Sequence, residues 1–323
     1  MDALSEVLRR VQLSGAVFFN AELSAPWALL SPSSDVLARV LMPEAEHLIE
    51  YHLLLEGDCW IRVGHDDRAE PLALAQGDLV MVAQGDPHRM SSDREGRSNV
   101  LPSESIELPT GGNFAVARHG GGGAVTRLVC GYLAIDRRLC APLLDALPPL
   151  LHVNAAGSEL DGWLRTYLRL QLEASAGLSA GSACVLSKLS ELMFVEAIRR
   201  HAAQQPADRT NWLAGLRDPA VSRALAAIHA EPAERWTVDS LAREAGVSRS
   251  GLAARFTELI GQSPMHYLTQ WRLRLAAHLL RTTSRPASSV GFEVGYESEA
   301  AFSRAFRREF GSPPSSWRRS DPG

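Results

Sequence analysis

The chain of 323 residues has few of the features that mark secreted, membrane-bound or disulfide-linked proteins. Its four cysteines are scattered and include no Cys-x-x-Cys pair, which argues against a zinc module and a disulfide framework and suits a reducing cytoplasm. No run reaches the roughly 18 apolar residues of a membrane helix. The first residues, MDALSEVLRRVQLSG, include acids and no long apolar core, so we expect no signal peptide. These absences favour a cytoplasmic protein with no membrane partner.

The composition is that of an ordinary globular protein, with 46% hydrophobic and 22% charged residues. The length allows two or three domains of roughly 100–200 residues each. Lysine is absent from residues 217–323, which hold 15 arginines and 11 acids and carry a net charge of +4, whereas residues 1–216 carry −8. An acidic first part and a basic second part predict different partners, with nucleic acid for the second, although modest charge asymmetry between domains is also common.

Two kinds of sequence pattern divide the chain. Residues 15–136 read as short β segments broken by Gly, Pro, Asp and Ser, which is typical of a barrel or sandwich, and helical patterns follow. We therefore expect an α+β multidomain fold. Its predicted parts are an N-terminal β-barrel domain at 1–136, a helical extension that serves as a connector at 137–203, a linker at 204–217 and an all-α domain at 218–323.

The all-α domain contains two predicted helix-turn-helix units, at about 236–260 and 287–310. In the first unit, a helix from about Val238 is followed by a glycine turn and by a second helix that Ser248 caps. A shift of 50 residues aligns Ser248 with Ser298, Leu252 with Phe302, Phe256 with Phe306, Gly261 with Gly311, Pro264 with Pro314 and Tyr267 with Trp317. Six matches at one spacing indicate a tandem helix-turn-helix.

The segment SSVGFEVGYESEAAFSRAFRREFGSPPSSWRR, in the second unit, resembles the signature of the AraC/XylS transcriptional regulators. It is similar in its Gly-aromatic-x-Ser-x-x-x-Phe-Ser-Arg-x-Phe pattern and in the Gly-x-x-Pro that follows. The resemblance covers residues 218–319. It implies a bacterial, cytoplasmic transcription regulator that is not an enzyme, binds double-stranded promoter DNA and contacts RNA polymerase if it is an activator.

The second helix of that unit lies in GYESEAAFSRAFRREFG and predicts how DNA is read. Its phenylalanines fall four residues apart and share one side of a helix, so Arg304, Arg307 and Arg308 lie away from the core. We expect Arg304 to reach base edges in the major groove and the other two arginines to contact phosphates. The alternative is a solvated arginine face on a surface helix. The candidate DNA contacts of this unit are Ser298, Glu299, Ser303, Arg304, Arg307 and Arg308.

The equivalent helix of the first unit has a different surface. Ala254 stands where the second unit has Arg304, and a small side chain cannot make the bidentate contacts to guanine that arginine makes. We expect this helix to dock mainly on phosphates, with contacts to thymine methyl groups as the alternative. Its candidate DNA contacts are Ser248, Arg249, Ser250, Ala254, Arg255 and Thr257.

The first domain resembles the cupin-type sensor domains of one subset of the AraC/XylS family. GDLVMVAQGDPHRM is similar to the second cupin motif and includes His88, and Glu50 has the spacing to Gly57 of the first motif, but the paired histidines that usually precede the glutamate are missing. The resemblance implies a pocket for a small-molecule effector. The candidate ligand-binding residues are Glu50, His52, Trp60 and His88.

A metal site is the alternative use of three of these residues. His52 shares a strand face with Glu50 by the two-residue alternation, and with His88 the two could supply three convergent ligands. Because the first motif is degraded, we expect a metal-free pocket and no cofactor. Trp60 is expected to fill the barrel rather than to stack on a ligand.

Two other functions and one interface are left open by the sequence. A regulator that senses oxidants through Cys130 and Cys140 would need exposed thiols beside positive charge, whereas buried cysteines are usually inert packing residues. A metal-dependent cupin enzyme would leave the tandem helix-turn-helix unexplained. Residues 182–200 are apolar on more than one face, which predicts a homodimer through this helix unless the barrel alone covers it.

Overall fold

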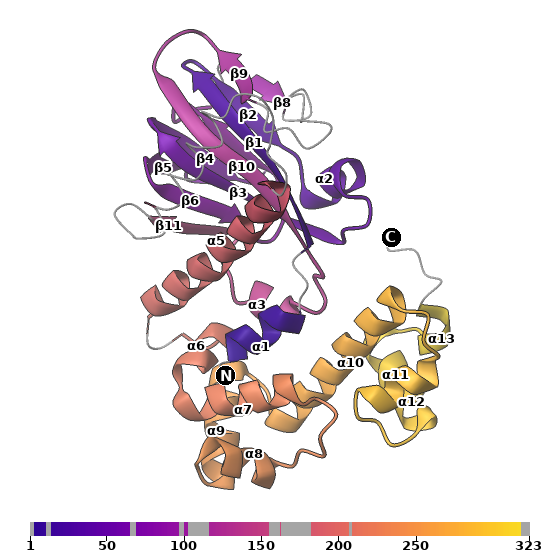
Figure 1. The fold of residues 1–323 in the computed structure, drawn as a ribbon. Coiled ribbons are helices and arrows are strands. Elements are labelled where there is room, and N and C mark those ends of the chain that lie inside the picture. The colour runs from indigo at the N-terminus through magenta and orange to yellow at the C-terminus, as the bar shows by residue number, and fades with distance from the viewer. Residues whose placement is uncertain are drawn as a thin grey trace. The chain divides into compact units, whose positions relative to one another are not determined.

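The chain divides into two compact units in the computed structural model. The sheet-rich unit comprises residues 13–135 and 147–204, and the helical unit comprises residues 1–12, 136–146 and 205–323. Figure 1 shows the strands in indigo to pink and the C-terminal helices in orange to yellow. The structure describes residues 3–10, 14–64, 69–96, 100–102, 116–154, 162, 182–206 and 209–317.

Two sheets form the sheet-rich unit. The six-stranded sheet has the order β11 (Leu150–Asn154), β6 (Asp78–Val82), β3 (His47–Glu56), β10 (Val125–Ile135), β1 (Ser14–Ser24), β9 (Val116–Gly120). The five-stranded sheet has the order β5 (Leu72–Ala75), β4 (Asp58–Val63), β7 (His88–Ser91), β2 (Ala28–Ser31), β8 (Val100–Pro102). Neighbouring strands are antiparallel, apart from the parallel pairs β1–β9 and β2–β8. The expected barrel thus takes the form of two sheets.

The core of the sheet-rich unit lies between the two sheets. Leu48 of β3 packs there with Ile61 of β4 and Met90 of β7. The opposite face of β3 is also buried, because the Tyr51 hydroxyl bonds with the Ser190 hydroxyl at 2.9 Å and Ser190 lies on α5 (Ser182–Gln204), which covers the larger sheet (Figure 1). A polar side chain on the inner face of β3 is therefore enclosed by both sheets.

The predicted helical extension at 137–203 is only partly helical. Leu150–Asn154 forms the edge strand β11, which pairs with β6, and a short helix, α3 (Ala141–Leu144), precedes it. The apolar run of β11 is too short to be told from a piece of helix by periodicity. Most of the predicted extension between β11 and α5 lies outside the described residues.

The predicted linker at 204–217 ends in a helix. Trp212–Arg217 forms α6, in which Trp212 is buried and donates its Nε1–H to the Tyr267 hydroxyl at 2.9 Å. The helical unit thus begins before residue 218. The first residues of the chain also differ from the expectation, because α1 (Ala3–Arg10) packs against a helix of this unit, α7, rather than against the sheets.

Seven helices make up the described part of the helical unit after α6. They are α7 (Pro219–Ala230), α8 (Val238–Ala245), α9 (Arg249–Ile260), α10 (Pro264–Thr282), α11 (Ala287–Glu293), α12 (Glu299–Phe310) and α13 (Pro314–Trp317). The pairs α8–α9 and α11–α12 are the two predicted helix-turn-helix units. Among the described residues, one more helix, α2 (Ser34–Leu41), belongs to the sheet-rich unit. Among the described helices, none has the length and apolar character needed to cross a membrane.

The two helix-turn-helix units repeat each other in detail. Ser248 and Ser298 cap α9 and α12, and each hydroxyl accepts a hydrogen bond from the backbone N–H three residues later, at 3.1 and 3.2 Å. Gly261 and Gly311 end the same helices in the left-handed conformation, with φ of 80° and 76°. The repeat predicted from the spacing of 50 residues is therefore confirmed.

Each unit closes over equivalent buried side chains. Leu252 and Phe256 of α9 and Phe302 and Phe306 of α12 are all fully buried. In the second unit a glycine lets the helices cross closely, since a Cβ atom on Gly291 would lie 2.8 Å from Phe302 Cδ1. The packing of this unit thus requires glycine at position 291, where a side chain would collide with Phe302.

Arg272, on α10, ties the two helix-turn-helix units together. Its guanidinium donates hydrogen bonds to the carbonyl oxygens of Pro232 at 2.6 Å and Glu234 at 2.7 Å, in the loop before α8, and of Gly295 at 3.2 Å, in the turn between α11 and α12. Helix α10 itself has 19 residues and spans roughly 28 Å. One side chain of the joining helix thus contacts the loop that leads into the first unit and the turn inside the second.

Candidate functional site: the DNA interface and the interior cluster

Helix α12 presents the arginine face that its sequence predicts, because its buried phenylalanines hold the opposite face against the core. The exposed candidates are Ser298, Glu299, Arg304, Arg307 and Arg308, and Ser303 is half-buried. Within the described structure, none of these three arginines has a carboxylate within ion-pair distance. These arginines can therefore bind an anionic partner without first breaking an ion pair within the protein.

Helix α9 differs in the state of its arginines. Arg249 lies 3.5 Å from Asp239, and Arg255 lies 3.6 Å from Asp218, the N-cap of α7. The first pair is exposed and the second is partly exposed, since Asp218 is half-buried. Surface pairs of this kind contribute little to stability but lower the local positive charge. The exposed candidates of this helix are Ser248, Arg249, Ser250, Ala254, Arg255 and Thr257. The two equivalent helices therefore present unequal surfaces, short and partly neutralised on α9 and cationic on α12.

A second candidate site lies inside the sheet-rich unit, where five polar side chains meet between the sheets. Glu50 and His52 come from β3, His88 begins β7, Ser31 ends β2 and Cys130 lies in β10. All five are buried, with Glu50 at 1% exposure. The strand alternation that points the apolar residues of these strands into the core also points these side chains there.

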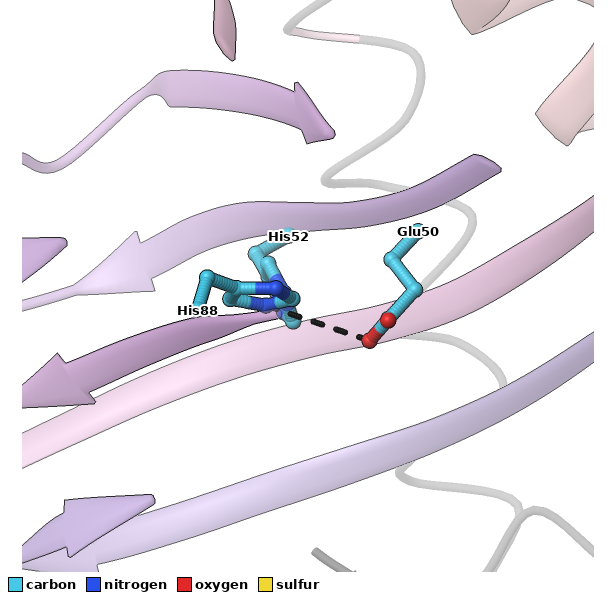
Figure 2. Close-up of side chains that lie close together, drawn as sticks. All are labelled: Glu50, His52 and His88. Atoms are coloured by element: carbon cyan, nitrogen blue, oxygen red, sulfur yellow. Dashed lines mark hydrogen bonds and ion pairs between the residues drawn. The ribbon is translucent and has the colours of Figure 1, made fainter. Parts of the chain in front are cut away.

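The contacts within this cluster are close, and Figure 2 shows three of its members, Glu50, His52 and His88. His52 Nε2 lies 2.8 Å from His88 Nε2, and His52 Nδ1 lies 3.0 Å from Cys130 Sγ. Ser31 donates its hydroxyl hydrogen to Glu50 Oε2. His88 Nε2 lies 3.8 Å from the same oxygen. The structure thus brings together three of the four candidate ligand-binding residues, Glu50, His52 and His88.

Burial keeps the cluster neutral at pH 7. It raises the pKa of Glu50 to about 8, against the opposing effect of the Ser31 hydrogen bond. Burial lowers the pKa of His88 to about 4, and burial together with the nearby His88 lowers the pKa of His52 well below its usual value. Although His88 and Glu50 are close enough for an ion pair, their contact is therefore one between neutral groups.

Trp60 is not part of this site. Cys59 and Ile61, its neighbours on β4, point into the core, so Trp60 faces the other side of the sheet, where the Arg94 guanidinium lies 5.6 Å from its ring centre. Trp60 therefore does not fill the barrel, and it lies apart from the three other residues with which it was predicted to bind a ligand. The sequence CWIRV could have predicted this orientation, because residues alternate between the two faces of a strand and Cys59 and Ile61 share the apolar face.

The sequence missed Ser31 as a partner of Glu50 and Cys130 as a partner of His52. Nothing in the linear spacing could have found them, because each comes from a strand remote in sequence. Burial raises the pKa of the Cys130 and Cys140 thiols well above the usual value. Both cysteines are free and buried, so neither has the exposed, acidic thiol that an oxidant sensor uses.

The fold and the two sites define a DNA-binding regulator with a sensor-type domain, and comparison with known proteins agrees. Residues 2–203 match the model of a cupin family, and residues 241–320 match that of a helix-turn-helix domain family. The chain is 36% identical over 321 residues to an AraC-like transcription regulator of Streptomyces lividans, covering 99% of this chain and 98% of that protein. It is 32% identical over 334 residues to the transcriptional regulator AlkR of Acinetobacter baylyi, covering 98% and 99%.

Among solved structures, the chain is similar to the DNA-binding domain of the transcriptional factor AdpA in complex with a target DNA. The identity is 31% and the TM-score 0.30, over 32% of this chain and 91% of that one. The chain belongs to the AraC-like transcription regulators, with a cupin domain before its helix-turn-helix domain. It is a DNA-binding regulator of transcription and not an enzyme, as the sequence resemblance implied.

The unequal surfaces of α9 and α12 predict an asymmetric DNA site. Arg304→Ala should weaken binding to the preferred sequence by roughly 1–3 kcal/mol and relax the base preference at one position, because a bidentate contact is lost. Ala254→Arg should change the preference only in the other half of the site, about one helical turn or roughly 10 base pairs away. Selection of bound sequences from random DNA, with wild type and both variants, measures both effects.

Arg307→Ala provides the matched control for the first change. It should weaken binding to all sequences alike, because a phosphate contact carries no base information. The slope of the logarithm of the binding constant against the logarithm of the salt concentration should fall by about one, because one phosphate contact is lost. Equal information content in the two half-sites of the wild type would contradict the asymmetry.

The neutral cluster predicts how stability depends on pH. Between pH 6.5 and 8, Glu50 is ionised only in the unfolded state. The free energy of unfolding of the sheet-rich unit should therefore fall by roughly 2 kcal/mol over this range. Below pH 6.5 the two histidines take up protons only in the unfolded state, which lowers stability as the pH falls. Protonation of Glu50 in the unfolded state acts in the opposite direction, but two histidines outweigh one glutamate. Urea unfolding followed by circular dichroism, in buffer with a chelator, should therefore show a stability maximum near pH 6.5, the usual histidine value.

Glu50→Gln is the control, because glutamine has the same shape and does not ionise. The loss of stability above pH 6.5 should disappear in this variant, while the loss on the acid side should remain and become steeper. Identical pH profiles for wild type and Glu50→Gln would show that Glu50 is ionised in the folded protein.

Proposed function

We propose that the sheet-rich unit senses a small chemical signal at its interior cluster and that this signal changes how the helical unit binds promoter DNA. The observation that supports the proposal is the enclosure of Glu50, His52 and His88 in an otherwise apolar core. Buried ionisable groups destabilise a fold compared with apolar residues of the same size. A role in binding the signal would explain why these three groups are kept in the core.

We also propose a location and a protein partner for this regulator. It acts in the cytoplasm, where its DNA is, and contacts RNA polymerase if it is an activator. The oxidant-sensing alternative through Cys130 and Cys140 is not favoured by their burial. The proposed ligand set is reduced from the sequence prediction to Glu50, His52 and His88.

A reporter assay tests the sensing role. A promoter containing the DNA sequence selected by the protein drives the reporter in cells that are challenged with a panel of small molecules and metal salts. Glu50→Gln and His52→Gln should lose the response that the wild type shows, because each removes a polar group of the cluster. His119→Gln, a histidine substitution on β9, should respond as the wild type does. A full response in both cluster variants would rule the cluster out as the sensor.

We also propose that two copies of the chain pair through α5. On this helix Leu189 and Met193 are buried against the unit itself, whereas Val185 and Leu192, one heptad apart, are 39% and 44% exposed. An apolar strip of this kind on a charged helix surface fits a second copy of the same helix. Met193 is therefore unsuited to test the interface, because a charge there would disturb the core.

Leu192→Glu should convert the dimer to a monomer, since it places two like charges in the proposed interface. Sedimentation at micromolar concentration measures the change. Val40→Glu, the same kind of change at an exposed apolar position on α2, is the control and should remain dimeric. A wild-type chain that sediments as a monomer would remove the proposal.

A further inference from the structure

We infer that Glu50, His52 and His88 form a binding site for one divalent transition-metal ion of the Zn²⁺ type, contrary to the metal-free pocket that the sequence predicts. This inference deepens the proposed function, on whose choice of site it rests. The missing histidines of the first cupin motif are replaced here by a histidine two residues after the glutamate, on the same face of β3 (Figure 2).

The distances fit a metal ion after small side-chain movements. One donor atom from each of Glu50, His52 and His88 lies within 4.8 Å of the other two. A tetrahedral Zn²⁺ with bonds of about 2.0–2.1 Å keeps its ligand atoms roughly 3.3 Å apart. The 2.8 Å separation of the two Nε2 atoms must therefore widen, and the 3.8 Å separation of His88 Nε2 from Glu50 Oε2 must shrink, each by about half an ångström.

The outer nitrogen atoms of both rings already face acceptors. His52 Nδ1 lies 3.0 Å from Cys130 Sγ, and His88 Nδ1 lies 3.5 Å from the Asp86 carbonyl oxygen. When each Nδ1–H donates to its acceptor, both Nε2 lone pairs point at the site. Histidines that bind metals are usually oriented in this way by a hydrogen bond from the other ring nitrogen.

Without a cation, one of the two Nε2 atoms must carry a hydrogen, because two lone pairs cannot face each other at 2.8 Å. His52 can supply it by donating its Nε2–H to His88, while its Nδ1 accepts from the Cys130 thiol. A cation binds both Nε2 atoms when His52 changes to the other tautomer and donates its Nδ1–H to Cys130 Sγ. A metal ion that binds both Nε2 atoms lets both rings keep their outer partners.

The unpaired carboxyl oxygen of Glu50 also favours a bound cation. Its Oε2 accepts the Ser31 hydrogen bond, but its Oε1 is buried without a hydrogen-bond partner in the described structure. An unpaired buried carboxyl oxygen is costly and rare, and a cation that binds there in place of the Glu50 proton would remove the cost. Two imidazoles and one carboxylate are suitable ligands for Zn²⁺ and its first-row neighbours, and three protein ligands leave a coordination position for a further ligand.

Metal binding to the purified, full-length protein tests the inference without DNA. After removal of metals, the wild type should take up about one Zn²⁺ per chain, and Co²⁺ should give the visible absorption typical of four-coordinate sites. X-ray absorption should show nitrogen and oxygen neighbours at about 2.0–2.2 Å and no sulfur at about 2.3 Å, because Cys130 is placed behind the His52 ring. Uptake below about one ion in ten chains, or a sulfur ligand, would overturn the inference.

Variants locate the site. His52→Ala and His88→Ala should each weaken Zn²⁺ binding by more than the roughly 10–100-fold expected for Cys130→Ala, which removes only an orienting partner. His119→Gln should bind as the wild type does. Equal binding by wild type and both ligand variants would place the ion elsewhere and refute the inference. Because uptake by the wild type is measured directly, the result stands even if a variant folds poorly.

The two proposals fail in different ways. A protein that binds Zn²⁺ at this site but shows the same promoter output in the Glu50 and His52 variants has the metal site without the sensing role. A protein that loses its response in those variants but takes up no metal keeps the sensing role and lacks the metal site.

Discussion

The hydrogen bonds of Arg272 are the contact on which the geometry of the DNA-binding surface depends. The side chain lies on α10 and reaches carbonyl groups beside both helix-turn-helix units. Burial lowers the pKa of Arg272, yet arginine stays charged, and its planar fork of donors can serve three carbonyl oxygens at once. Lysine, a point charge on a flexible stem, could not replace it in this role. Arg272 thus links the loop before α8 to the turn before α12, and it acts together with the packing of α9 and α12 on α10.

The same scaffold carries two different surfaces on these helices. Cap serines, terminal glycines and buried side chains repeat from one unit to the other because each helix must begin, end and pack in the same way. The outward residues are free of that constraint, so Ala254 and Arg304 can differ. The ion pairs of Arg249 and Arg255 increase the contrast, since they leave most of the available positive charge on α12.

The interior cluster shows a different balance between stability and function. A core of aliphatic residues at these positions would avoid the cost of burying Glu50, His52 and His88. The cost is limited because all three groups are neutral when buried, and because Ser31 and Cys130 provide partners. Neutral imidazoles and a carboxyl group that can ionise are suited to binding a cation.

The sequence alone determined the order of the two domains, the tandem helix-turn-helix and the caps that begin and end its helices, because these depend on local periodicity and on contacts between near neighbours. It also identified Glu50, His52 and His88 as candidates. Tertiary structure decided what required distant strands and loops to meet. It added β11 to the sheet, placed Trp60 on the outer face, joined Ser31 and Cys130 to the cluster and brought Arg272 to both helix-turn-helix units. Such contacts depend on strand pairing and helix packing, which residue spacing along the chain does not specify.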